Sequence, residues 1–182
     1  MKTNFFLTSL IIVLFSITAN SQITKGNWMV GGDGNYLNYT SSQNGNTNKY
    51  SMIEINPDIG YFIKDRFVAG SYLKFQYISH EQADNSHYYL GIFTRYYFLN
   101  QKDIYNVFSQ INYDYNIHIS NLNSYGHGYG LKLGIVAFFT NSVGLEFSLG
   151  YDINTTKDEF SSKIKTNNIK ANIGFHFYLE KK

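Results

Sequence analysis

The chain of 182 residues contains no cysteine and a single proline, Pro57. The absence of cysteine excludes disulfide bonds, thiolate metal sites and a lipid anchor on a cysteine at a leader cleavage point. Charged residues make up only 15% of the chain, and the formal net charge is +2 with no basic cluster. These values give no basis for a nucleic-acid partner. They also fall short of the roughly 25–35% charge that covers a soluble surface, so we expect much of the surface to face something other than water.

Long apolar runs are absent after residue 21, where no segment reaches the roughly 18–20 apolar residues of a membrane-spanning helix. One uncharged apolar run lies at the N-terminus, between Lys2 and the small residues Ala19 and Ser21. A positive start, a short apolar core and small residues before the cut are typical of a secretory signal peptide. We therefore expect residues 1–21 to be a signal peptide removed before Gln22, and residues 22–182 to form one domain. A retained anchor is disfavoured because the run is too short to span a bilayer.

The sequence does contain a period-two alternation of apolar and polar residues, which is clearest from Tyr105 to Ile117. This pattern is typical of a β-strand with one apolar and one polar face. The run exceeds a usual globular strand and fits the roughly 9–11 residues that a tilted strand needs to cross a bilayer. Eight such segments occur, at residues 28–39, 50–63, 67–78, 87–98, 105–118, 125–139, 143–154 and 168–179.

The connections between these segments alternate in length. Short ones occupy residues 64–66, 99–104 and 140–142, and mostly longer ones, rich in Asn, Ser, Thr and Gly, occupy 40–49, 79–86, 119–124 and 155–167. Short periplasmic turns and longer outer loops are the layout of an outer-membrane barrel. The sequence therefore predicts an all-β fold, an eight-stranded antiparallel up-and-down transmembrane β-barrel with both termini on the periplasmic side.

Alternation alone leaves open which face points outward, because a soluble lipocalin-like barrel with an apolar interior would show the same pattern. Glycines such as Gly130 and Gly150 recur in the polar register. They would make a poor water-facing surface but relieve crowding inside a narrow barrel. We therefore expect the apolar register to face lipid and the polar register to fill the interior. The predicted interior charge network comprises Glu54, Asp58, Lys74, Arg95, Asp114, Lys132, Glu146 and Lys170, and Asp33 and Asp152 share its register.

Aromatic residues, 18% of the chain, gather near the ends of the segments. Toward the long loops lie Tyr77, Tyr113, Tyr115 and Tyr151, and toward the short turns lie Phe62, Phe67, Phe98, Phe139 and Phe177. Aromatic rings prefer the headgroup level of a membrane, so these residues are predicted to form two girdles. Ordinary β-propensity of Tyr and Phe is the alternative, but it does not predict two bands.

Several segments resemble the small outer-membrane β-barrel proteins of the OmpA/OmpX-like superfamily, in particular the Bacteroidetes-type barrel domain. The resemblance is carried by residues 26–32 (GNWMVGG), 57–67 (PDIGYFIKDRF), 95–98 (RYYF), 143–151 (VGLEFSLGY) and 172–179 (NIGFHFYL). It covers essentially the whole mature chain and contains no catalytic signature. It implies an outer-membrane location in a Gram-negative cell, contact with membrane lipid and lipopolysaccharide, and insertion by the barrel-assembly machinery.

The chain departs from that family at its end, because Leu179, Glu180, Lys181 and Lys182 follow Tyr178, whereas family members commonly stop on the aromatic residue of the last strand. Pro57 also lies inside a predicted strand, where it removes a ladder hydrogen bond. We therefore expect a β-bulge at Pro57.

The histidines raise the possibility of an enzyme, since some outer-membrane barrels are lipid-modifying hydrolases. His127 is the best candidate, with Ser124 and Ser120 nearby, but no nucleophile motif surrounds either serine. The spacing of His80, His87 and His118 matches no metal-ligand pattern. His176 is expected inside the barrel as a hydrogen-bonded filler.

The sequence thus predicts no catalytic, cofactor-binding or metal site. We expect a non-catalytic, monomeric outer-membrane barrel with a plugged polar interior and a structural or surface-interaction role through its long loops, above all residues 40–49 and 155–167. A lipid-modifying hydrolase and a narrow channel for small solutes remain as alternatives, although eight strands leave too little room for an open aqueous path.

Overall fold

The computed structural model describes residues 23–43, 46–80, 83–101, 103–117, 124–158 and 164–181. Within these ranges no helix is long and apolar enough to cross a membrane. The predicted signal peptide, His118 and Ser120 lie outside the described residues.

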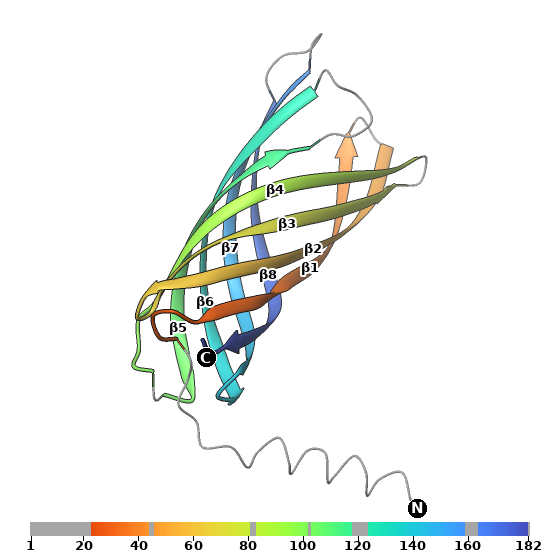
Figure 1. Ribbon diagram of the computed structural model, residues 1–182. Coiled ribbons are helices and arrows are strands. Elements are labelled where there is room, and N and C mark those ends of the chain that lie inside the picture. The colour runs from red at the N-terminus through yellow and green to blue at the C-terminus, as the bar shows by residue number, and fades with distance from the viewer. Residues whose placement is uncertain are drawn as a thin grey trace, which may run out of the picture.

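Eight strands form one closed antiparallel barrel in which each strand pairs with its sequence neighbours and the first pairs with the last. The strands are β1 (Trp28–Gln43), β2 (Asn46–Lys64), β3 (Phe67–His80), β4 (Ala83–Tyr97), β5 (Tyr105–Asn116), β6 (Ser124–Thr140), β7 (Val143–Asp158) and β8 (Ile164–Leu179). Strand β1 begins and β8 ends at the lower end of the barrel in Figure 1. The predicted fold class is confirmed.

The strands are longer than predicted at the end opposite the short turns. Strands β1 and β2 fill most of residues 40–49, and β7 and β8 extend into residues 155–167 from both sides. The prediction that these segments are long loops is therefore wrong for much of their length. Their Asn, Ser and Thr residues show no apolar alternation, but their backbones still pair with the neighbouring strand.

The side-chain alternation separates an apolar outer face from a polar interior. Along β5 every second residue is buried, and in β8 Ile173 is 60% exposed, while Glu146 on β7 is 2% exposed. Leu133 and Leu149 also lie on the outer face. This arrangement is the reverse of a lipocalin-like barrel, so the soluble alternative is excluded.

Pro57 does not produce the expected bulge. Gly32 lies opposite Pro57 in an unbroken β1–β2 register, and the β2–β3 register is the same on both sides of the proline. The β2–β3 ladder omits Asn56 and Pro57, so the missing N–H is accommodated without an extra residue. The irregularities lie instead at Phe62–Lys64 and Phe138–Thr140, next to short turns, where Arg66 adopts a positive φ of 65°.

The short-turn end of the barrel is closed by an apolar cluster that the sequence did not predict. Its buried side chains are Ile23, Met29, Phe62, Val68, Tyr72, Phe93, Tyr97, Phe108, Val136, Phe138 and Tyr178. Phe62 is therefore inside the barrel, and its prediction as a girdle residue is wrong, because it lies in the inward register of β2. The first and last described residues lie beside this cluster, where Arg66 N donates to Ile23 O and Lys181 N donates to the Asn27 side chain.

Candidate functional site in the barrel interior

A buried arginine on β4 organises the interior just above the apolar cluster. Arg95 Nη1 donates to Glu146 Oε1 at 2.7 Å, and its Nε donates to Gln110 Oε1 at 2.8 Å. The guanidinium carbon lies 4.3 Å from the centre of the Phe108 ring. Arg95 is therefore held by a carboxylate, an amide and an aromatic face, the combination that a desolvated guanidinium needs.

His176 on β8 joins two carboxylates from different strands. Its Nε2 lies 2.9 Å from both oxygens of Asp58, and its Nδ1 lies 3.1 Å from Glu146 Oε1. Tyr178 donates to the same Glu146 oxygen at 3.1 Å, and its hydroxyl lies 3.0 Å from that of Tyr97. Glu146 therefore connects β4, β7 and β8 through one carboxylate.

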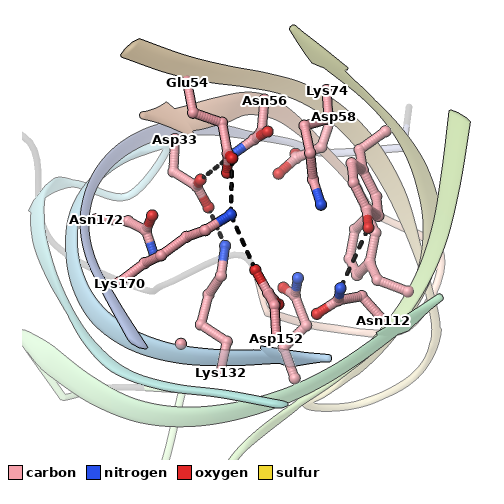
Figure 2. Close-up of a pocket in the computed structure, with 14 residues that line it drawn as sticks. Asp33, Glu54, Asn56, Asp58, Lys74, Asn112, Lys132, Asp152, Lys170 and Asn172 are labelled. Carbon is pink, nitrogen blue, oxygen red and sulfur yellow. Dashed lines mark hydrogen bonds and ion pairs between the residues drawn. The ribbon is translucent and has the colours of Figure 1, made fainter. Parts of the chain in front are cut away.

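A second set of ion pairs fills the middle of the interior (Figure 2). Lys170 Nζ lies between Glu54 Oε2, at 2.7 Å, and Asp152 Oδ2, at 3.1 Å. Lys132 pairs with Asp33 across the barrel from β6 to β1. Asn56 Nδ2 donates to both Asp33 Oδ1 and Glu54 Oε1, so these contacts join β1, β2, β6, β7 and β8 into a single network.

Lys74 and Asp114 form the third pair, between β3 and β5, at 2.9 Å. Tyr72 donates to the same Asp114 oxygen at 2.9 Å and accepts a bond from Asn112 at 3.2 Å. The structure thus places all eight residues of the proposed charge network inside, where each contacts an oppositely charged side chain or, for Asp58, the ring of His176. Asp33, Asp152 and His176 complete this charge network. The alternation in the sequence predicts that these three side chains face inward, but it does not predict which residues they contact.

The interior carries more carboxylates than permanent cations. Among the described residues the inward acids are Asp33, Glu54, Asp58, Asp114, Glu146 and Asp152, against Lys74, Arg95, Lys132 and Lys170. Each cation contacts at least one acid, so the pairs satisfy one another across strands. Buried charges need such pairing, because an unpaired one is strongly destabilising.

The space left between these side chains is small. A cavity of about 30 Å³ is lined by Asp33, Glu54, Asp58, Lys132, Asp152 and Lys170, among others. That volume holds about two water molecules. With the apolar cluster below it, side chains fill most of the described part of the interior.

Glycine in the inward register makes this dense packing possible. A Cβ on Gly70 would lie 2.3 Å from the backbone oxygen of Ile59, and one on Gly130 would lie 2.3 Å from Asp152 Oδ1. Both distances are below van der Waals contact, so a side chain at either position requires its surroundings to move.

Apart from Phe62, the aromatic residues proposed for the girdles face outward. Tyr77, Tyr113, Tyr115, Tyr151, Phe98, Phe139 and Phe177 are exposed, and Phe67 is half-buried. Tyr113 packs against Tyr129 with ring centres 5.2 Å apart, and Trp28 against Tyr61 at 5.1 Å. Outside the predicted bands, Trp28 and Tyr129 are exposed and Tyr61 is half-buried, and Trp28 and Tyr61 carry the same sequence signal because they lie near strand ends.

The histidines do not converge in the described residues. His127 lies half-buried on the outer register of β6, where its ring packs edge-on against Tyr129 with centres 5.8 Å apart. No group of three or more His, Asp or Glu side chains in the described ranges is arranged to hold a metal ion. His176 is the hydrogen-bonded interior residue that the sequence predicted.

Comparison with solved structures places this architecture in the outer-membrane β-barrel class. The outer membrane protein OprG from Pseudomonas aeruginosa matches with a TM-score of 0.56 and 11% identity, over 91% of this chain and 100% of that one. The N-terminal β-barrel domain of Pseudomonas aeruginosa OprF matches with a TM-score of 0.52 and 13% identity, over 85% and 98%. No protein-family model and no curated protein sequence matches the chain. The chain therefore has the fold of the small outer-membrane barrels.

Proposed function

We propose that this chain is a non-catalytic protein of the outer membrane of a Gram-negative cell, with a structural or surface-interaction role. The observation that carries the proposal is the outer face, where residues such as Ile92, Leu133, Leu149 and Ile173 are exposed over the middle of the strands. An apolar band of this kind, with aromatic residues at its rims, matches the hydrocarbon layer and its interfaces. In water the same surface would be an aggregation hazard.

The interior supports a plugged barrel and offers no support for a reaction. Every described ion pair ties strands together, and the cavity of about 30 Å³ has no room for a substrate beyond water. We infer that the partners are membrane lipid and lipopolysaccharide around the barrel, and an extracellular ligand at residues 40–49 and 155–167. Because the first and last strands pair and close the barrel, we expect a monomer.

The proposal includes the route to the membrane. We infer that residues 1–21 direct export and are removed, and that the barrel-assembly machinery inserts the chain by its aromatic last strand, which carries Phe175, Phe177 and Tyr178. Membership in the OmpA/OmpX-like superfamily is part of the same proposal, on the segments quoted above.

Envelope fractionation combined with heat-dependent gel migration tests the location. We expect the mature chain in the outer-membrane fraction, migrating faster before boiling than after it, because a closed barrel stays compact in detergent. Recovery in the soluble periplasm with unchanged migration would contradict the proposal.

Catalysis is tested separately by incubating the purified barrel with phospholipid and lipopolysaccharide. We expect no turnover. Hydrolysis that disappears in a His127→Ala variant would show that the chain is an enzyme.

A further inference from the structure

The ladder that closes the barrel is shorter than the two strands that form it. Strands β1 and β8 pair only from Trp28 opposite Leu179 to Gly34 opposite Ile173. Beyond that point the side chains of Asn35 and Asn172 are joined by a 2.9 Å hydrogen bond. Strand β1 nevertheless continues to Gln43, paired with β2 throughout, and β8 reaches back to Ile164, paired with β7. In the described residues, β1 beyond Gly34 thus has a free backbone edge.

The hydrogen-bond pattern identifies which groups face this edge. Phe62 N donates to Asn27 O, so the odd-numbered residues of β1 direct their backbone groups toward β2. The register is unbroken to Gln43, so the even-numbered residues Tyr36, Asn38, Thr40 and Ser42 direct theirs toward the free edge. On β8, Tyr178 N donates toward the β7 side, and the odd-numbered residues such as Asn167 therefore face β1.

The free edge of β1 lacks the features that normally protect an edge strand. Proteins block such edges with charged residues, proline or bulges. Residues 35–43 contain no Asp, Glu, Lys, Arg or Pro, and their register with β2 has no irregularity. The facing segment of β8 differs, because it carries Lys165 and Lys170. The edge of β1 is thus preformed, regular in register and uncharged.

We infer that residues 37–43 of β1 bind an extended peptide segment of another protein by adding it as a strand. Regularly spaced backbone donors and acceptors are complementary to another extended backbone, which is the basis of β-augmentation. The inference rests on the proposed function, which places this end of the barrel outside the cell. Strand addition at β1 is the chemical form that we give to the surface interaction in the proposed function.

The surrounding side chains indicate which peptide fits. Tyr36 is exposed at the start of the edge, with its hydroxyl bonded to Asn38 Oδ1 at 3.0 Å, and offers a ring to a cross-strand aromatic or β-branched residue. Lys165 is exposed on the opposing strand and favours an acidic residue in the peptide. The ligand is therefore an extended, proline-free segment with β-branched or aromatic residues and at least one carboxylate.

Binding is measured by fluorescence anisotropy with the purified full-length barrel in detergent and a defined probe. The probe is a fluorescein-labelled, end-capped peptide of alternating valine and threonine with a central glutamate. Its control is the same peptide N-methylated at alternate backbone nitrogens, because these methyl groups remove the N–H donors along one edge of the extended peptide. We expect saturable binding of the first peptide and none of the second.

Two proline variants at opposite positions identify the edge. Thr40→Pro removes a backbone N–H that faces the free edge of β1 and leaves the β1–β2 ladder intact. Asn167→Pro removes the corresponding N–H on the facing edge of β8 and leaves the β7–β8 ladder intact. We expect Thr40→Pro to weaken binding at least tenfold and Asn167→Pro to leave it unchanged. Heat-dependent migration of both variants shows that each barrel is folded, and it tests the proposed function independently of peptide binding.

Four results would overturn the inference. They are absence of saturable binding to the folded wild type, equal affinity in both variants, a dimer in light scattering that Thr40→Pro dissociates, and a quantitative disulfide in a Thr40→Cys, Asn167→Cys double variant. The dimer would show that a second copy of β1 occupies the edge. The disulfide would show that β1 and β8 pair with each other.

Discussion

Arg95 shows at the level of a single residue why the interior is stable. Its charge is fully buried, and Glu146, Gln110 and the Phe108 ring are the groups that replace water around it. The gain from such a pair over an apolar pair of the same size is small. Removing one partner is costly, because the other charge stays buried.

Arg95→Ala is therefore expected to destabilise the barrel by about 3–5 kcal/mol, because the buried Glu146 carboxylate loses its nearest cation and keeps only His176 and Tyr178 as partners. Urea unfolding, followed by the fluorescence of the single tryptophan, Trp28, measures this change. In the matched double variant, Arg95→Met with Glu146→Leu, no charge is left unpaired, and we expect most of the stability to return. A loss as large in the double variant as in Arg95→Ala would contradict this account.

Two inward glycines provide a second test at the residue scale. The Cβ of Gly70→Ala would lie 2.3 Å from Ile59 O, whereas the Cβ of Gly150→Ala would have its nearest neighbour at 3.7 Å. We expect the first substitution to cost about 1–3 kcal/mol through overpacking and the second to be nearly neutral. The same urea measurement compares them, and equal effects would show that crowding does not select glycine here.

The strands show how one alternating pattern serves two surfaces. On β6, Leu133 faces outward and Lys132 faces inward to Asp33, so adjacent residues lie in opposite environments. The strand register must be fixed in this fold, because a slip of one residue would turn the apolar side chains into the interior and the charged ones outward. The cross-strand ion pairs and the apolar cluster both favour the observed register.

Leu133→Arg is expected to impair insertion, because an arginine near the bilayer midplane costs about 2–4 kcal/mol. Folding into lipid vesicles, scored by heat-dependent migration, measures the effect. Ile104→Arg is the control, because Ile104 is 69% exposed in the β4–β5 connection, near the end of the barrel. Insertion of both variants with equal efficiency would contradict a lipid-facing Leu133.

For the whole molecule, the closed interior predicts that the barrel does not conduct. Salt bridges occupy its middle, and Phe62, Phe108, Tyr97 and Tyr178 pack together at the short-turn end. We expect no stepwise conductance from the wild type in planar bilayers. A Tyr97→Ala, Phe108→Ala variant removes two rings of the cluster and is expected to conduct more. Stable wild-type steps would favour the narrow-channel alternative.

Much of this architecture could be predicted from the chain. The alternation from Tyr105 to Ile117 and its counterparts gave the strands and the fold class, because period two survives wherever one face is apolar. Glycines in the polar register indicated which face is internal. The same signal fails in residues 40–49, where both faces are polar, so the sequence predicts a loop where the structure has the ends of β1 and β2.

Sequence alone thus determined the strand number, the inward and outward faces and the residue types that fill the interior, since these depend on local periodicity and composition. Tertiary structure decided which charges meet, as in Lys170 with Glu54 and Asp152, because residues distant in sequence come together only when the barrel closes. It also decided that Phe62 packs inside, and that the β1–β8 ladder ends at Gly34 while both strands continue. Neither follows from periodicity, because the twist and closure of the sheet set where side chains converge and where backbones part.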